Sequence, residues 1–452
     1  MSSFVETSLR KSQLQQEFIR TDGVDPAIAP LVKHQKMTQS PFRFLRGSSG
    51  LFYADIKREL LQLPNALTEL PLVRVMGDCH LANFGFFTEE GSSGERVIFG
   101  PNDFDDACVG HAVWDLSRFA VSLLLAADYC RGLLSGTYRA DNEADLSALK
   151  VATEKDADKA MLAFFSEYSK ELTRIHNNPE RRFNAQDDFP KIHLLKPFLK
   201  KAIKRSAAGE QFSTKSTLAK TVDLTARPLR FKQDAGKFTR LDETSYQQVL
   251  TAFRPFVDDD IVDLVARQGA GTGSLNLQRY YLLVGPTQLC SDADLALYHV
   301  VEAKQQRRSA PLAFFAGLSP VNELNDAHLT VDCQRLMQRR PDLVLDDHQF
   351  EGAHYLLRSL HHANVDLDPE DICLHPVNPA LAMRQYAQAC AVALALAHSR
   401  SDRRSCRFEQ QMVTALTTHQ AQLAASCRQY AMQQVQDCQL LQQMLPVAQQ
   451  QQ

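Results

Sequence analysis

The sequence predicts an α+β fold with two lobes, a larger lobe rich in helices and a smaller lobe rich in strands. Between residues 115 and 176 apolar side chains recur at the i, i+3, i+4 spacing of amphipathic helices, and residues 379–445 return to that spacing. Residues 220–300 contain short strand-like runs separated by turn-forming residues. The expected units are a helical lobe over 1–215, a β-rich lobe over 216–366, and C-terminal helices over 367–452 that pack on the helical lobe.

Composition excludes several classes of function. The 452 residues include 50 basic and 53 acidic side chains, so the formal net charge of −3 gives no reason to expect a nucleic-acid partner. No run of about 18 apolar residues predicts a membrane span, and the first residues do not resemble a signal peptide. The ten cysteines include no Cys-x-x-Cys pair. We expect a cytoplasmic protein with reduced thiols and no membrane partner.

The N-terminal part of the chain contains a predicted strand, a loop and a hairpin in close succession. Residues 72–76 form a short apolar run that leads into Gly77-Asp78. Two further strand-like runs, 84–87 and 96–99, flank a turn-rich segment and predict a hairpin. Such a hairpin would fold Asp103 back beside Asn83. A second hairpin is predicted further along, between residues 229–232 and 237–240.

The loop and the first hairpin carry the residues of a phosphoryl-transfer site. Asp78 precedes Asn83 by five residues, and Asp103 follows the hairpin, within Asn102-Asp103-Phe104-Asp105. In kinases, an Asp at the first position accepts the proton of the acceptor hydroxyl, and the Asn and the second Asp hold Mg²⁺ on the ATP phosphates. We therefore assign Asp78 as the catalytic residue, with Asn83 and Asp103 as the metal ligands.

Three neighbouring residues have predicted supporting roles. His80 is a candidate hydrogen-bond partner within the loop, and Asp105 is placed to assist the metal ligands. Asp115, in Trp114-Asp115-Leu116, begins a predicted helix and is expected to brace the loop through its backbone N–H groups.

The parts that should cover and neutralise the phosphates are missing upstream of Asp78, because too few residues precede it. They occur downstream. A glycine-rich segment can present backbone N–H groups to phosphates, and a strand about thirty residues later ends at Lys304. The candidate nucleotide-binding residues are Gly269, Gly271, Gly273, Ser274, Lys304 and, in the next predicted helix, Asp332. The nucleotide lobe of a kinase has this order: a glycine-rich loop, a strand, and a second strand that carries the lysine. In this sequence the order occurs after the catalytic loop.

These segments together resemble the bacterial family known as domain of unknown function 2252. The segments that carry the resemblance are residues 41–47, 77–85, 102–107, 114–116, 269–274, 301–304 and 386–401. The Gly-Asp-x-His-x-x-Asn loop is also similar to that of aminoglycoside phosphotransferases. The resemblance implies a protein-kinase-like fold with its lobes in permuted order. It also implies a Glu as the partner of Lys304, where this chain has the shorter Asp332.

The predicted function is an ATP- and Mg²⁺-dependent phosphotransferase that acts on a hydroxyl of a small molecule. An AMP transferase on the same fold remains open, because it needs the same metal ligands. A non-catalytic kinase-like protein that binds nucleotide is a third alternative, favoured by Asp332 and opposed by the complete set of Asp78, Asn83 and Asp103. The sequence does not identify the acceptor or the oligomeric state.

Overall fold

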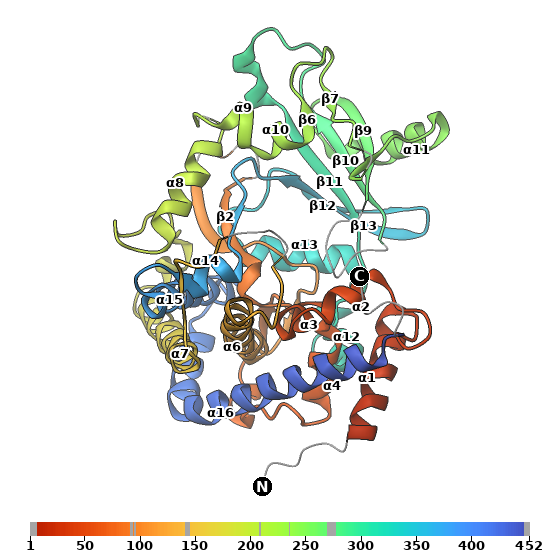
Figure 1. The fold of residues 1–452 in the computed structure, drawn as a ribbon. Helices are drawn as coiled ribbons and strands as arrows, with labels where there is room; N and C mark the ends of the chain where they lie inside the picture. Colours follow the sequence, from red (N-terminus) through yellow and green to blue (C-terminus); the bar gives the residue numbers. More distant parts are fainter. Residues whose placement is uncertain are drawn as a thin grey trace.

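The chain folds into a mixed α+β structure in which a bundle of helices supports a twisted antiparallel sheet (Figure 1). This computed structural model describes residues 7–90, 94, 96–140, 145–207, 209–234, 236–268 and 277–446. The α+β class predicted from the sequence is confirmed.

Four long helices form the centre of the helical part, and their apolar faces share one core. The first of them is followed directly by Gly136, whose backbone φ of 78° is the left-handed conformation that commonly terminates a helix. The second begins with a capping box between Thr153 and Asp156, and the third with an Asn378 cap followed by proline. The four are α6 (Ala112–Ser135), α7 (Glu154–Asn177), α15 (Pro379–Arg400) and α16 (Arg407–Met444).

Helix α15 is long and apolar enough to cross a membrane by length and composition alone. However, 67% of its most apolar 18-residue window is buried inside the fold, where it packs against α7. Its apolar character therefore has an explanation in the core of the helical part.

The N-terminal helices pack beside the C-terminal helix. A fully buried Arg10 joins them, since its guanidinium donates to Asp55 at 2.7 Å and to Asp437 at 2.9 Å. Removing Arg10 would leave two buried carboxylates without a compensating charge. These helices are α1 (Thr7–Asp22), α2 (Val32–Met37), α3 (Pro41–Gly47), α4 (Ser49–Lys57) and α5 (Asn65–Thr68).

Short strands frame the loop that contains Asp78. Strand β1 (Val73–Val75) leads into the loop and pairs with β4 (Cys108–Gly110). The 3₁₀ turn η1 (Leu81–Asn83) leads into β2 (Phe84–Thr88), which pairs antiparallel with β3 (Val97–Pro101). The first predicted hairpin is therefore confirmed.

The β-rich part is a six-stranded antiparallel sheet of order β12-β13-β11-β10-β9-β8. Its hydrophobic residues form two clusters, one on each face. Helix α13 (Asp326–Met337) lies between this sheet and the helical part, and α11 (Glu243–Phe253) lies at the opposite side (Figure 1). The strands are β8 (Phe238–Thr239), β9 (Ile261–Arg267), β10 (Arg279–Val284), β11 (His299–Gln305), β12 (Leu345–Phe350) and β13 (Ala353–Leu360).

The second predicted hairpin is wrong. Strand β7 (Arg230–Phe231) pairs with β6 (Val222–Asp223), whereas β8 pairs with β9. The buried carboxylate of Asp263 explains the arrangement, because it accepts from the Phe231 backbone N–H at 2.7 Å and holds β7 against β9.

The sheet is tied to the Asp78 region by the chain that leaves β13. After four residues this chain forms β14 (Val365–Asp366), which pairs with β2. The nucleotide-lobe candidate and the catalytic-loop candidate are thus held side by side by backbone hydrogen bonds. The remaining short elements are β5 (Lys150–Val151), β15 (Leu374–His375), α8 (Leu195–Arg205), α9 (Phe212–Lys215), α10 (Thr217–Thr221), α12 (Leu312–Phe315), α14 (Pro369–Cys373), η2 (Pro179–Phe183), η3 (Arg254–Phe256), η4 (Asp292–Leu297), η5 (Ala316–Leu318) and η6 (Pro320–Glu323).

Candidate functional site

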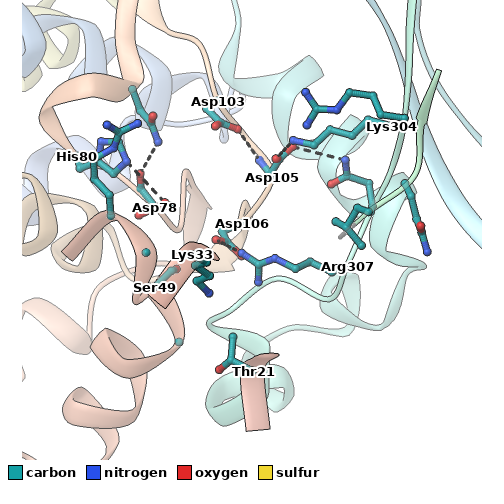
Figure 2. A pocket seen from close by; sticks show the side chains of 18 of the residues that line it. Thr21, Lys33, Ser49, Asp78, His80, Asp103, Asp105, Asp106, Lys304 and Arg307 are labelled. Atoms are coloured by element: carbon teal, nitrogen blue, oxygen red, sulfur yellow. Dashed lines mark hydrogen bonds and ion pairs between the residues drawn. The ribbon is translucent and has the colours of Figure 1, made fainter. Parts of the chain in front are cut away.

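A cavity of about 210 Å³ lies where the N-terminal helices, the Asp78 loop and the C-terminal end of β11 meet (Figure 2). It gathers six of the residues predicted from the sequence, although they come from segments more than 200 positions apart. These residues are Asp78, His80, Asn83, Asp103, Asp105 and Lys304.

The carboxylate of Asp78 has one oxygen engaged by an arginine. Arg118 Nε donates to Asp78 Oδ1 at 2.5 Å, and Arg118 Nη2 donates to the Leu45 carbonyl at 2.8 Å. The arginine side chain is completely buried, whereas that of Asp78 remains 22% exposed. Arg118 therefore fixes the orientation of Asp78 and leaves Oδ2 directed toward the cavity and toward His80, 3.7 Å away.

The backbone in front of Asp78 is braced from two sides. Asp115 accepts from the N–H groups of Met76 at 2.7 Å and Gly77 at 3.1 Å, contacts of the kind expected from the sequence. Tyr53 donates to the Gly77 carbonyl at 2.6 Å. His398 Nε2 donates to the Asp115 carboxylate at 3.1 Å, and its Nδ1 is hydrogen-bonded to the hydroxyl of the buried Tyr168. Buried polar groups satisfied in this way hold a loop in one conformation.

Gly77 is required by geometry at this position. Its φ is +73°, and a Cβ there would lie 1.7 Å from the Asp106 carbonyl oxygen. No side chain fits, because the obstacle is backbone. The Asp78 loop and the segment after β3 are therefore packed backbone against backbone at Gly77 and Asp106, with no room for a side chain between them.

Asn83 is oriented by the same loop. Its Nδ2 donates to the Asp78 carbonyl at 2.9 Å, so the side-chain oxygen is the atom left to bind a cation. The Asn102 backbone N–H donates to the Asn83 carbonyl at 3.2 Å, which brings the end of β3 beside the loop. Asn83 and Asp103 both line the cavity, as the predicted hairpin required.

Asp103 and Asp105 differ in their electrostatic environments. Burial, followed by repulsion from Asp105, raises the pKa of Asp103 to about 6. Burial also acts to raise the pKa of Asp105, but the positive charges of Lys304 and Arg358 outweigh it and hold that pKa below its usual value. Asp105 forms an ion pair with Lys304, from β11, across 199 positions of sequence (Figure 2).

Asp106 anchors the chain that follows β11. Its carboxylate accepts from Arg307 Nη2 at 3.0 Å and from the Ala310 backbone N–H at 2.8 Å. Its carbonyl accepts from the Ser309 hydroxyl at 2.6 Å. Asp106 is 3% exposed, so its role here is to join the two segments rather than to present a free carboxylate.

Two arginines from the sheet extend the charged surface beyond Asp103. Arg279 and Arg358 pair with Glu302, at 3.1 and 2.9 Å. They line both the first cavity and a second one of about 370 Å³, which also contains Asn83 and Asp103. The metal-ligand candidates therefore share their cavity with three cationic side chains of the sheet, because Arg279 is the cross-strand neighbour of Lys304 and Arg358 that of Glu302.

One of the predicted nucleotide contacts, Asp332, is not found in the cavity. Asp332, on α13, pairs with Arg74 at 3.0 Å and is not among the cavity-lining residues, while Lys304 pairs with Asp105. The pairing of Lys304 with this helix, which the family resemblance implied and the shorter Asp332 put in doubt, is therefore replaced by two other ion pairs. The glycine-rich segment, with Gly269, Gly271, Gly273 and Ser274, lies outside the described residues.

His80 is almost completely buried beside Asp78. Burial, followed by the positive charges of Arg46 and Arg118, holds the pKa of His80 well below its usual value. In the described part of the chain, its Nδ1 has no hydrogen-bond partner. The imidazole is thus neutral at physiological pH and acts as a polar wall of the cavity rather than as a cation.

The donor set fits Mg²⁺ only together with a ligand that supplies more oxygens. Over the described residues, no group of three or more His, Cys, Asp or Glu side chains is arranged to hold a metal ion. Mg²⁺ is commonly bound by one or two carboxylates, with waters and substrate phosphates completing its octahedron. The amide oxygen of Asn83 and the carboxylate of Asp103 are donors of that type.

Sequence reasoning missed the arginines of the site. Arg118 lies three residues after Asp115, on the same helix, and this spacing was the available signal. Arg358 lies directly opposite Glu302 in the β11–β13 register, a pairing that only the fold reveals.

Comparison with known proteins identifies the family. The model described as "Uncharacterized protein conserved in bacteria (DUF2252)" matches residues 25–134 and 147–444. The chain therefore belongs to this family, and the resemblance noted in the sequence is confirmed at that level. No curated protein and no solved structure matches the chain.

Proposed function

We propose that the protein is a kinase-like phosphotransferase that uses ATP and Mg²⁺ and acts on a hydroxyl of a small molecule. The fold supports this proposal through the order of elements along the chain. Strand β9 is followed by the glycine-rich segment, then by β10, by β11 with Lys304 and later by helix α13. In protein kinases a Gly-rich loop covers the phosphates, the lysine lies on the third strand, and a helix follows. Here this lobe follows the catalytic loop in the chain, so the order is permuted.

The ion pair between Lys304 and Asp105 is the observation that carries the proposal. It places the strand lysine within reach of the Asn83–Asp103 pair, across one cavity. A buried ammonium opposite two oxygen donors suits a polyphosphate with its cation. In this proposal Lys304 would exchange Asp105 for phosphate oxygens, and Asn83 and Asp103 would hold a metal ion that supplies positive charge beside the transferred group.

Asp78 would orient the acceptor. With Oδ1 held by Arg118, Oδ2 is the atom that accepts the hydroxyl proton as the new O–P bond forms and the bond to the leaving ADP breaks. Arg118 and the Asp115 contacts leave this carboxylate little freedom, so it would be held in position to accept that proton.

The test is turnover by an Asp78→Ala variant. Wild-type protein, incubated with Mg·ATP and a bacterial metabolite extract, should consume ATP and form a modified small molecule. Asp78→Ala should keep Mg·ATP affinity within about twofold and lose turnover by about 10²-fold or more, the usual contribution of a general base. Asp188→Ala, a change at an exposed carboxylate on the surface, is the matched control. Turnover in Asp78→Ala equal to wild type would overturn the assignment.

Transfer of AMP is a second candidate, favoured by Arg279 and Arg358. These guanidinium groups also line the second cavity, together with Asn83 and Asp103, so a triphosphate could extend toward them and present its α-phosphate to Asp78 instead. Mass spectrometry of the product separates the candidates, since it is heavier by a phosphate or by an AMP. Binding of Mg·ATP with no turnover of any compound in the extract would favour the non-catalytic alternative.

A further inference from the structure

The wall of the cavity opposite Lys304 contains a helix N-terminus that no side chain caps. Helix α4 begins at Ser49, and the preceding Ser48 turns its hydroxyl to the Phe44 carbonyl, at 2.6 Å, instead of to the first N–H groups of α4. An uncapped N-terminus presents backbone N–H groups and the positive end of the helix dipole. Gly47, Ser49 and Gly50 all line the cavity at this point.

A polar side chain at the same place lacks a partner. Ser49 is 5% exposed, its Oγ has no hydrogen-bond partner in the described part of the protein, and it lines the cavity on the Asp78 side (Figure 2). A buried hydroxyl without a partner costs free energy unless a ligand or water completes its bonds. Ser49 and the N-terminus of α4 therefore offer several donors to one ligand.

Cations from two neighbouring helices border the same wall. Arg46 lines the cavity, and among the described residues it forms no ion pair, its guanidinium lying only over the Phe42 ring at 6.0 Å. Lys33 also lines the cavity and gives one of its three N–H donors to Asp22, at 2.7 Å. Glu17, the α1 carboxylate nearest Gly50, is already paired with Arg20.

We propose that Ser49, Arg46, Lys33 and the N-terminus of α4 bind a phosphate group carried by the acceptor. The acceptor would then be a small phosphorylated molecule whose free hydroxyl faces Asp78. This rests on the function proposed above, in which Asp78 receives the acceptor. The donors converge from a helix end, a hydroxyl and two cationic side chains, an arrangement that suits a tetrahedral anion. Asp78, Asp103, Asp105 and Asp106 face the same cavity, so an anionic acceptor needs such dedicated donors to enter it.

Calorimetric titration of the full chain with inorganic phosphate tests this site, first alone and then in the presence of Mg²⁺ and a non-hydrolysable ATP analogue. We expect Ser49→Ala and Arg46→Gln each to weaken phosphate binding by about tenfold, the effect of losing one hydrogen bond to a charged group. Ser169→Ala removes a hydroxyl on α7 that is also buried without a partner, and Arg404→Gln removes an exposed guanidinium; both should bind phosphate like wild type. Circular dichroism verifies that each variant is folded.

The outcomes separate this inference from the proposed function. Phosphate binding that is absent in wild type, or unchanged in both Ser49→Ala and Arg46→Gln, overturns the site. Phosphate binding that the ATP analogue abolishes also overturns it, because the anion would then occupy the nucleotide's own phosphate position. If the analogue itself does not bind, the proposed function fails, while the comparison of variants still decides whether the phosphate site exists.

Discussion

At the scale of single residues, the site depends on contacts that allow almost no substitution. Asp78 is held by Arg118, and the backbone before it is held by Asp115. Gly77 lies so close to the Asp106 carbonyl that the loop and the segment after β3 are fixed relative to each other. The position of the candidate base is therefore set by steric contact as well as by hydrogen bonds.

Replacing Gly77 tests this steric contact. Gly77→Ala should lower the free energy of unfolding by on the order of 3 kcal/mol, because the left-handed φ and the overlap with backbone both oppose a Cβ. Gly136→Ala is the matched control. Its φ is +78° but nothing lies within 4 Å of the added Cβ, so it should lose only about 1–2 kcal/mol. Thermal unfolding measures both, and equal losses would contradict the account.

At the scale of elements, α13 differs from the helix that the family resemblance led us to expect. Asp332 faces Arg74 on β1, and Lys304 instead meets Asp105 from the segment after β3. The helix thus ties the sheet to the region around Asp78 through β1, while the lysine is oriented by the segment after β3. The shorter Asp332 side chain suits a partner on β1.

Because Lys304 pairs with Asp105 and not with Asp332, we expect the Asp332→Ala and Lys304→Ala variants to differ in their affinity for Mg·ATP. Asp332→Ala should leave Mg·ATP affinity within about twofold and change stability by no more than about 1 kcal/mol, because its pair with Arg74 is partly exposed. Lys304→Ala should weaken Mg·ATP binding by about tenfold or more. Calorimetry provides both affinities. A tenfold loss in Asp332→Ala would show instead that α13 acts on the nucleotide side.

The elements themselves were largely predictable, because their signals are local. Turn residues between 84–87 and 96–99 specified the β2–β3 hairpin, and the spacing of apolar residues specified α6 and α15. The hairpin predicted at 229–240 failed because a distant carboxylate, Asp263, holds β7 against β9. Local patterns do not contain such partners.

At the scale of the whole molecule, one cavity unites segments from the start, the middle and the last third of the chain. Two kinds of contact hold the sheet against the Asp78 loop. Strand β14, which follows β13, pairs with β2, and Lys304 and Arg307 form ion pairs with Asp105 and Asp106. The joint position of Asp78, Asn83 and Asp103 in this cavity could be predicted from the sequence because their spacing is local. Arg358 and Ser49 could not, since they join the cavity only when helices and strands far apart in sequence are packed together.

The most direct test of the central claim is the affinity of the cavity for Mg·ATP with and without Asp103. We expect wild-type protein to bind Mg·ATP in a calorimetric titration, to lose binding when EDTA removes the metal, and to be weakened by at least about tenfold in Asp103→Ala, with Asp188→Ala unchanged. The account would be contradicted if wild-type protein bound no Mg·ATP, or if Asp103→Ala bound it as tightly as wild type.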